Sequence, residues 1–131
     1  MLQPNEFDIQ RAFTIWYKGE KWSQGPKKGQ WKALPHKLPG VVAWHTPNGG
    51  TRSSAFEGMR LNQIGLEAGI HDYLFLWGGL YGLEFKKPGG DLHASQLRMH
   101  PLLLAAGMVA SATVDNLADA KAFVIRHGLV A

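Results

Sequence analysis

Three residues near the middle of the chain place acid and base side chains at a spacing that suits catalysis. Glu84 and Lys86 lie two positions apart in an apolar stretch, and side chains two apart in a β-strand point to the same face. Another apolar stretch follows Asp72, and Gly78-Gly79 separates the two, which predicts an antiparallel hairpin. Such a hairpin brings Asp72 level with Glu84. The sequence therefore predicts two carboxylates and one ammonium at one point of a sheet.

This group of side chains predicts metal-assisted hydrolysis of a phosphodiester bond. Two converging carboxylates repel each other unless a cation lies between them, and their oxygen atoms suit Mg²⁺ or Mn²⁺. A lysine beside such a metal can position a nucleophilic water or balance the charge that builds on a phosphate. Gln96 follows in the first turn of an expected helix, where its side chain can lean back toward a neighbouring strand end.

The elements that position these residues follow from apolar periodicity, capping residues and turns. Helices are expected at about 6–17, from Ser54 to Gly65 or Gly69, at about 94–105 and after an Asp115 cap; strands are expected at 41–46, in the hairpin and at 108–113. The order helix, strand, helix, strand, strand, helix, strand, helix predicts one α/β domain over residues 1–131. Its small mixed β-sheet would be flanked by helices. The residues expected to face the core from the first two helices are Phe7, Ala12, Phe13, Trp16, Phe56, Met59 and Ile64.

The segment from 18 to 40 has no periodicity and is predicted to be a long basic loop. Its first twenty residues contain six lysines and one acid, Glu20, and such a local excess favours an anionic partner, most commonly nucleic acid. The residues expected to contact phosphates are Lys21, Lys27, Lys28 and Lys32. Trp22 and Trp31 would stack on bases or sugars. The alternative, equally weighted, is that both tryptophans fold back on the core and the lysines only keep the loop soluble.

Composition bounds the class of protein. The chain has 131 residues, enough for one domain and too few for two, with 45% hydrophobic and 18% charged residues and a net charge of +4. It has no cysteine, which excludes disulfides and cysteine metal sites. The first residues lack the pattern of a signal peptide, and no apolar run approaches the roughly 18 residues of a membrane span. These features predict a cytoplasmic protein that does not enter a membrane.

The ordered motifs resemble the VRR-NUC family of small phage, bacterial and eukaryotic repair nucleases, within the PD-(D/E)XK nuclease superfamily. The resemblance covers most of the chain. It rests on Glu6 with Gln10, His45 to Arg52, Gly65 to Asp72, Gly82 to Lys86, Lys87 to Gly90, Gln96 and Gly107.

What the resemblance implies is a metal-dependent endonuclease with a restriction-endonuclease-like core. Asp72 and Glu84 would hold Mg²⁺ or Mn²⁺ together with the backbone carbonyl of Phe85. Glu6 would be an added acidic ligand, direct or through water. Lys86 would be the catalytic lysine, Gln96 would support the site, and Arg52 would contact DNA. The resemblance also implies a homodimer that acts on branched DNA such as Holliday junctions, in DNA repair, in a bacterial or phage-infected cell.

Two departures from the family pattern bear on these expectations. The family usually has proline before the aspartate, and this chain has His71. It is interpreted as a neutral bystander, with a contact to DNA or to the metal as the alternative. The segment 18–40 does not align with the family and is expected to influence substrate choice.

Other functions compete with a branched-DNA endonuclease. One is a nuclease that acts on RNA or on DNA ends. Another is a DNA-binding module whose nuclease site is weak or inactive. The intact Asp72, Glu84 and Lys86 argue against loss of the site.

Overall fold

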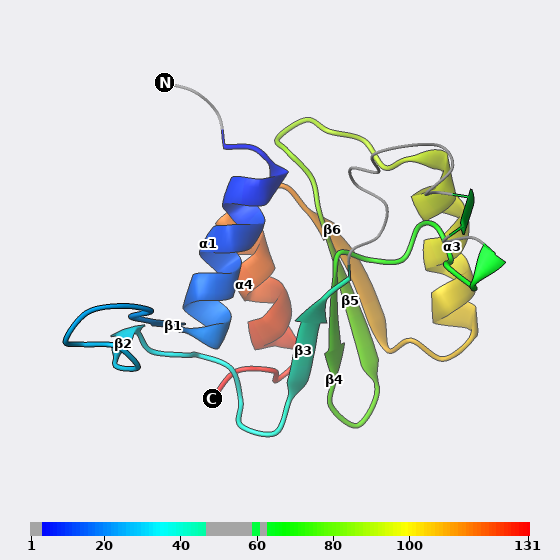
Figure 1. Cartoon of the computed structure of the whole chain (residues 1–131). Helices are drawn as coiled ribbons and strands as arrows, with labels where there is room; N and C mark the ends of the chain where they lie inside the picture. The colour runs from blue at the N-terminus through cyan, green and yellow to red at the C-terminus, as the bar shows by residue number, and fades with distance from the viewer. Residues whose placement is uncertain (1–3, 47–58, 61–62) are drawn as a thin grey trace. The chain divides into compact units, whose positions relative to one another are not determined.

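The computed structural model describes residues 4–46, 59–60 and 63–131. In chain order the elements are α1 (Glu6–Lys18), β1 (Glu20–Lys21), β2 (Trp31–Ala33), β3 (Val42–His45), β4 (Tyr73–Leu76), β5 (Leu80–Phe85), α3 (Ala94–Ala105), β6 (Ala110–Val114) and α4 (Leu117–Arg126) (Figure 1). The mixed α/β fold predicted from the sequence is confirmed. No helix among these described residues is long and apolar enough to cross a bilayer.

The chain divides into two compact units that are interleaved in sequence. The helical unit comprises residues 1–42, 85–90 and 113–131, and the sheet unit comprises residues 43–84 and 91–112. The helical unit contains α1, β1, β2 and α4. The sheet unit contains β4, α3 and most of the residues of β3, β5 and β6. The single domain expected over 1–131 stays a prediction.

α1 buries one side chain per turn against the rest of the helical unit. Ile9, Phe13 and Tyr17 are buried at intervals of four residues, which keeps them on one face of a helix. The ring of Phe13 lies 5.3 Å from that of Tyr17 and 5.6 Å from that of Phe85. The prediction that Phe7 joins this face is wrong, because its side chain is 70% exposed. Phe7 and Phe13 are six positions apart in the sequence, which places them on different sides of a helix.

α4 lies beside α1 in the helical unit (Figure 1). Its buried side chains are Ala120, Phe123 and Val124. The N-cap is Asn116, whose side chain accepts a hydrogen bond from the Asp119 backbone N–H at 2.8 Å, so the prediction of an Asp115 cap is off by one residue. The two ends of the unit are joined where the Tyr17 hydroxyl donates to the Leu129 carbonyl at 2.8 Å.

The segment predicted to be a long loop contains a β-hairpin. β1 and β2 pair in an antiparallel sheet, with Lys21 opposite Trp31. Backbone bonds of 2.9 Å from Trp22 N–H to the Gln30 carbonyl and from Gly29 N–H to the Trp22 carbonyl extend the pairing. The strands are too short for alternation to reveal them in the sequence, which explains why the prediction failed. We call residues 20–33 the tryptophan hairpin.

The four-stranded sheet has the order β3-β4-β5-β6. β4 and β5 form the predicted antiparallel hairpin, with a register that runs from Tyr73 opposite Leu83 to Leu76 opposite Leu80. β6 runs parallel to β5, because Val109 N–H bonds to the Leu80 carbonyl and Lys86 N–H bonds to the Val114 carbonyl. A parallel neighbour requires a crossover connection, and α3 lies within that connection.

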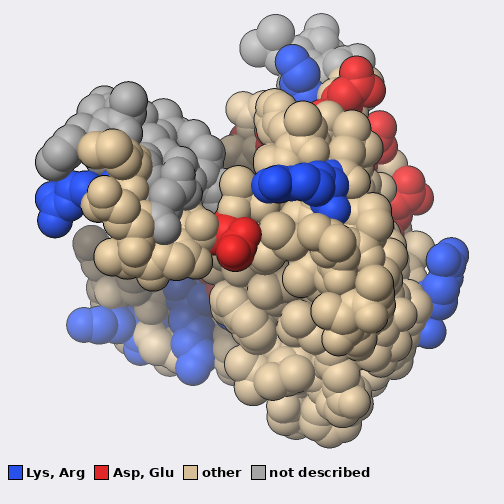
Figure 2. All heavy atoms as spheres, turned by 90° about the vertical axis from the view of Figure 1, so that its right-hand side faces the viewer, with Lys and Arg blue, Asp and Glu red and all other residues tan. Residues whose placement is uncertain are grey.

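The second predicted helix begins at Ser54, which lies outside the described residues. Phe56 and Arg52 also lie outside them. Met59 and Ile64, expected to face inward, are exposed. α3 also exposes apolar side chains, namely Leu97, Leu102 and Leu104. Figure 2 views the molecule from the side on which α3 lies, where the visible surface is largely uncharged and carries its charged side chains in separate groups. The densest run of lysines in the sequence lies in the tryptophan hairpin instead.

Candidate active site

The predicted pairing of Asp72 with Glu84 follows from the hairpin register. Asp72 lies in a bend immediately before β4. Continuing the register by one step beyond Tyr73 and Leu83 puts Asp72 across from Glu84. The Asp72 backbone carbonyl accepts a bond from Thr46 N–H at 2.8 Å and lies 2.9 Å from Nδ1 of His45. The chain is thus tied to the end of β3 at the residue that carries the carboxylate.

A close backbone contact fixes the segment that leads into Asp72. Gly69 has a φ of +89°, and a Cβ atom there would lie 2.2 Å from the Ser95 carbonyl oxygen. Glycine is therefore required both by the backbone conformation and by the approach to the first turn of α3. This contact brings the start of α3 next to the segment before Asp72.

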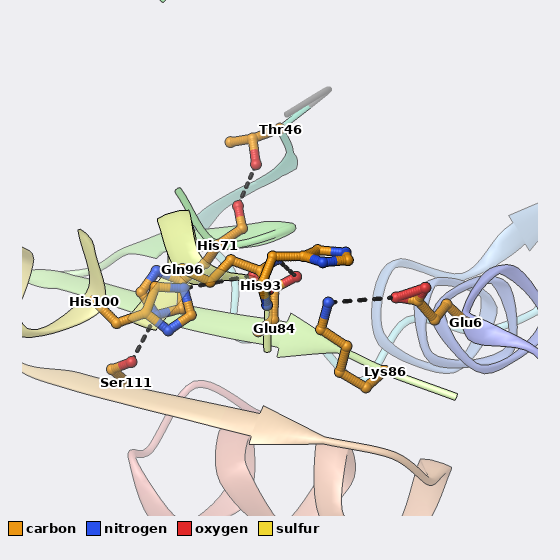
Figure 3. Close-up of polar contacts among 9 residues, drawn as sticks. All are labelled: Glu6, Thr46, His71, Glu84, Lys86, His93, Gln96, His100 and Ser111. Atoms are coloured by element: carbon orange, nitrogen blue, oxygen red, sulfur yellow. Dashed lines mark hydrogen bonds and ion pairs between the residues drawn. The ribbon is translucent and has the colours of Figure 1, made fainter. Parts of the chain in front are cut away.

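Glu84 is a buried carboxylate held by the first turn of α3. Its side chain is 1% exposed, and Nε2 of Gln96 donates to its Oε1 at 2.9 Å. Oε1 of Gln96 accepts from the His93 backbone N–H at 2.8 Å. The amide therefore bridges the helix start and the carboxylate (Figure 3). These two bonds determine which end of the amide is nitrogen, because a carboxylate accepts and an N–H donates.

His100 contacts the other oxygen of the same carboxylate. It lies four residues after Gln96, so both side chains project from one face of α3. Its Nε2 is 3.6 Å from Oε2 of Glu84. A buried carboxylate needs donors or positive charge to offset its lost hydration, and α3 supplies one group to each oxygen.

His71 packs flat between β5 and His100. The two imidazoles are stacked, with ring centroids 3.7 Å apart, and Nε2 of His71 shares a 2.6 Å hydrogen bond with the Ser111 hydroxyl. A Cβ atom on Gly82 would lie 2.7 Å from the His71 ring, so only glycine leaves room for it. Burial, with the nearby His100 as a second cause, lowers the pKa of His71 to about 4. The buried, neutral ring agrees with the bystander interpretation and not with a contact to DNA.

Lys86 and Glu6 form an ion pair in the helical unit. Lys86 is 5% exposed, and its Nζ lies 4.0 Å from Oε1 of Glu6, in the first turn of α1 (Figure 3). That α1 turn is fixed by the capping box between Asn5 and Asp8. The buried ammonium is thus held against a half-exposed acid.

Comparison with solved structures identifies the fold. The structure is similar to that of a "VRR_NUC domain protein", with a TM-score of 0.65 over 95% of this chain and 88% of that chain. This chain has the fold of a VRR_NUC domain protein. The sequences are 16% identical, so the likeness concerns the fold. No protein-family model and no curated protein matches the sequence.

The residues predicted to hold a metal offer oxygen donors of the type that Mg²⁺ prefers. Within residues 4–46, 59–60 and 63–131, no group of three or more His, Cys, Asp or Glu side chains could hold a metal. Mg²⁺ does not need such a cluster, because it is usually bound by one or two carboxylates, waters and substrate phosphates. Asp72, Glu84 and the Phe85 carbonyl fit that pattern in type. Glu6 is paired with Lys86, and its role as a ligand stays a prediction.

The lysines predicted to contact DNA all lie in the tryptophan hairpin. Lys21, Lys27, Lys28 and Lys32 are exposed. Trp22 and Trp31 are 41% and 43% exposed. Both tryptophans are therefore partly exposed and do not fold back fully on the core, and whether the lysines contact phosphates stays a prediction.

Sequence reasoning missed His100 and Ser111 as neighbours of the candidate site. Glu84 and His100 are sixteen residues apart, and no local pattern connects them. One signal was available, since Gln96 and His100 have the spacing of one helical face. His71 offered no comparable signal, because its partner Ser111 belongs to a strand forty residues away.

Proposed function

We propose that this protein is a divalent-metal-dependent nuclease that hydrolyses phosphodiester bonds in DNA. The observation that supports this most is Glu84, a carboxylate kept buried at the end of a hairpin by a donor from α3. Burying a carboxylate is costly, and such groups gather at functional sites, where their charge is used. The VRR_NUC fold, which a protein named for a nuclease domain shares, supports the same assignment.

In this proposal Asp72, Glu84 and the Phe85 carbonyl hold Mg²⁺ or Mn²⁺. A bound metal would act as a Lewis acid on the phosphate. Gln96 keeps one Glu84 oxygen in a fixed direction through its 2.9 Å bond, and the His93 N–H keeps Gln96 in place. The carboxylate is therefore oriented before a substrate arrives, which reduces the reorganisation needed in the transition state.

Lys86 acts on the phosphate. Only Phe85 separates it from Glu84, and an extended residue spans at most about 3.6 Å, so the two Cα atoms lie within about 7 Å. A buried ammonium is worth more to a developing charge than an exposed one. Glu6 balances the ammonium at 4.0 Å in the absence of substrate and serves as an added acidic ligand, direct or through water.

The substrate in this proposal is DNA with a branch, such as a Holliday junction, cut by a homodimer. Lys21, Lys27, Lys28 and Lys32 are exposed and suited to phosphate contacts; Arg52 is proposed as a further DNA contact. A nuclease on RNA or DNA ends, and a DNA-binding module without cleavage, are the alternatives that the experiments below separate.

The metal site is tested by calorimetry with Mn²⁺. Wild type should bind Mn²⁺, and Asp72→Asn and Glu84→Gln should each weaken binding strongly, because each removes one of the two carboxylates that the hairpin supplies to the metal. Glu67→Gln and Asp91→Asn are matched controls, since both residues are exposed acids of the same unit. Unchanged Mn²⁺ binding in both site variants would rule out this site.

The activity is tested on a panel of linear, flapped and four-way DNA and on RNA, with Mg²⁺, Mn²⁺ or EDTA. Cleavage of four-way or flapped DNA that EDTA abolishes supports the proposal. Cleavage confined to RNA or to DNA ends supports the other nuclease. Binding of DNA without cleavage of any member of the panel supports the binding module.

A further inference from the structure

The tryptophan hairpin exposes two aromatic rings in a paired and ordered segment. Lys21 lies opposite Trp31 in the β1–β2 register. Lys28 N–H bonds to the Gly25 carbonyl at 3.1 Å and Gln30 N–H bonds to the Lys27 carbonyl at 2.9 Å, so the connection between the strands is itself hydrogen-bonded. An exposed tryptophan offers a large apolar ring to a ligand, and tryptophan is enriched at binding surfaces.

Each of the two rings is accompanied by an ammonium group. Nζ of Lys21 lies 4.4 Å from the centre of the Trp31 ring, and Nζ of Lys32 lies 4.4 Å from that of Trp22. Lys27 lies farther from Trp22, at 6.0 Å. Both tryptophans keep roughly two fifths of their surface open to water. The hairpin thus repeats one arrangement twice, a partly exposed indole with an ammonium group over its ring.

We propose that the tryptophan hairpin binds unpaired nucleotides of a single DNA strand, an inference that rests on the proposed nuclease function and specifies its substrate. A base takes the place of the ammonium over each indole, and the displaced ammonium binds the neighbouring phosphate. Stacking on aromatic rings accepts any base and requires that its face be free. A continuous duplex hides those faces and offers only its backbone. The hairpin therefore favours substrates with an unpaired segment, such as a flap or the centre of an open junction.

The charge of the hairpin agrees with a nucleic-acid strand as the occupant. Its residues 20–33 carry four lysines and one acid. Glu20 lies 3.7 Å from Nζ of Lys32 and 4.0 Å from Arg11, so Lys32 is partly neutralised, whereas no acid within the described residues forms such a pair with Lys21. Trp31 with Lys21 is therefore expected to be the stronger of the two subsites.

The test measures binding in EDTA, where a metal-dependent nuclease does not cut. Wild type and variants are titrated with an oligothymidylate strand and with a blunt duplex of equal length, and tryptophan fluorescence and anisotropy of labelled DNA are recorded. Trp31→Ala and Trp22→Ala should each weaken single-strand binding about tenfold, as expected when one stacked base is released. Duplex binding should change by less than about twofold.

Matched variants separate stacking from folding and from charge. Trp77→Ala is the control, because Trp77 is 43% exposed but lies in the sheet unit. Trp31→Phe retains a ring and should retain part of the affinity if the indole is a stacking surface. Circular dichroism verifies that each variant is folded.

The outcomes distinguish this inference from the proposed nuclease. Single-strand recognition would be overturned if the variants weakened single-strand and duplex binding equally, or if neither tryptophan variant changed binding. It would also be overturned if polyglutamate, titrated as a polyanion without bases, bound as tightly as the oligothymidylate strand. These outcomes do not depend on the cleavage assay. Selective weakening of single-strand binding supports the inference even if no DNA is cut. In that case the nuclease proposal alone fails.

Discussion

The charged side chains are buried around Glu84 and exposed in the tryptophan hairpin. Around Glu84 the polar groups are buried, and each is placed by an element that is itself fixed, as Gln96 is by the start of α3. In the hairpin the charges are exposed and lie over rings that are also exposed. Buried charge is strong and specific in direction, whereas exposed charge is screened by salt. The contrast fits the proposal that the region around Glu84 performs the chemistry and the hairpin provides DNA affinity.

The largest expected effect is a loss of cleavage rate without a loss of DNA affinity. Lys86→Met keeps the aliphatic length and removes the charge, so cleavage should fall by about a hundredfold or more, the scale of losing one stabilising group. DNA affinity measured in Ca²⁺ should stay nearly unchanged. Single-turnover cleavage gives the rate, and Lys87→Met, at the exposed neighbour, is the matched control. Full cleavage by Lys86→Met would remove this lysine from the mechanism.

The second prediction is a loss of DNA affinity without a loss of the cleavage step. Replacing Lys21, Lys27, Lys28 and Lys32 by Gln should reduce the slope of log affinity against log salt by roughly 0.7–0.9 for each phosphate that a lysine no longer neutralises. Cleavage at saturating DNA should persist. The measurement is binding from low to moderate salt, with Lys87→Gln and Lys121→Gln as charge controls. An identical slope in the fourfold variant would show that the hairpin does not hold the DNA.

The third prediction sharpens the description of the buried region. Gln96→Ala leaves a Glu84 oxygen and the His93 N–H without their bonds to the amide, which should lower the free energy of unfolding by about 1–3 kcal/mol. Gln96→Glu should cost more, because it puts a second carboxylate beside Glu84. Urea denaturation measures both, and Gln63→Ala, at an exposed site of the same unit, is the control. Equal stability of all variants would contradict the proposed support.

The fourth prediction concerns the pH dependence of stability. The pKa of His71 is about 4 in the folded chain and 6.5 as its ordinary value, so between these values the unfolded chain binds a proton that the folded chain does not. Stability should therefore fall as pH falls from 6.5 toward 4, by at most about 1.4 kcal/mol per pH unit.

His71→Gln should flatten this dependence. Denaturation at several pH values measures it, with His36→Gln, an exposed histidine, as control. A slope unchanged by His71→Gln would mean that this ring does not resist protonation in the fold.

The β4–β5 hairpin and the order of the long elements are predictable because their signals are local. Two apolar stretches around Gly78-Gly79 specify the turn, and the turn specifies the register that brings Asp72 level with Glu84. The tryptophan hairpin is not predictable in this way. Its strands have two and three residues, so it depends on bonds across the turn and on lysine–tryptophan contacts rather than on alternation.

The candidate site is predictable in its acids and not in what surrounds them. Spacing alone identifies Glu84 and Lys86, and helix position suggests Gln96. The burial of Lys86 beside Glu6 and the stacking of His71 on His100 depend on tertiary packing between distant segments. Phe7 shows the same limit, because its place on α1 depends on which face the rest of the unit covers.

The first turn of α3 gives the orientation of Glu84 a reporter that needs neither metal nor DNA. The His93 amide proton is held by the Gln96 side chain, which also holds Glu84. Exchange of that proton with solvent requires its bond to Gln96 to open, so its protection factor measures how often the helix start releases the Gln96 side chain. The exchange rate of this single backbone proton therefore reports how firmly the Gln96 side chain is held. It should rise in any variant that loosens the helix start.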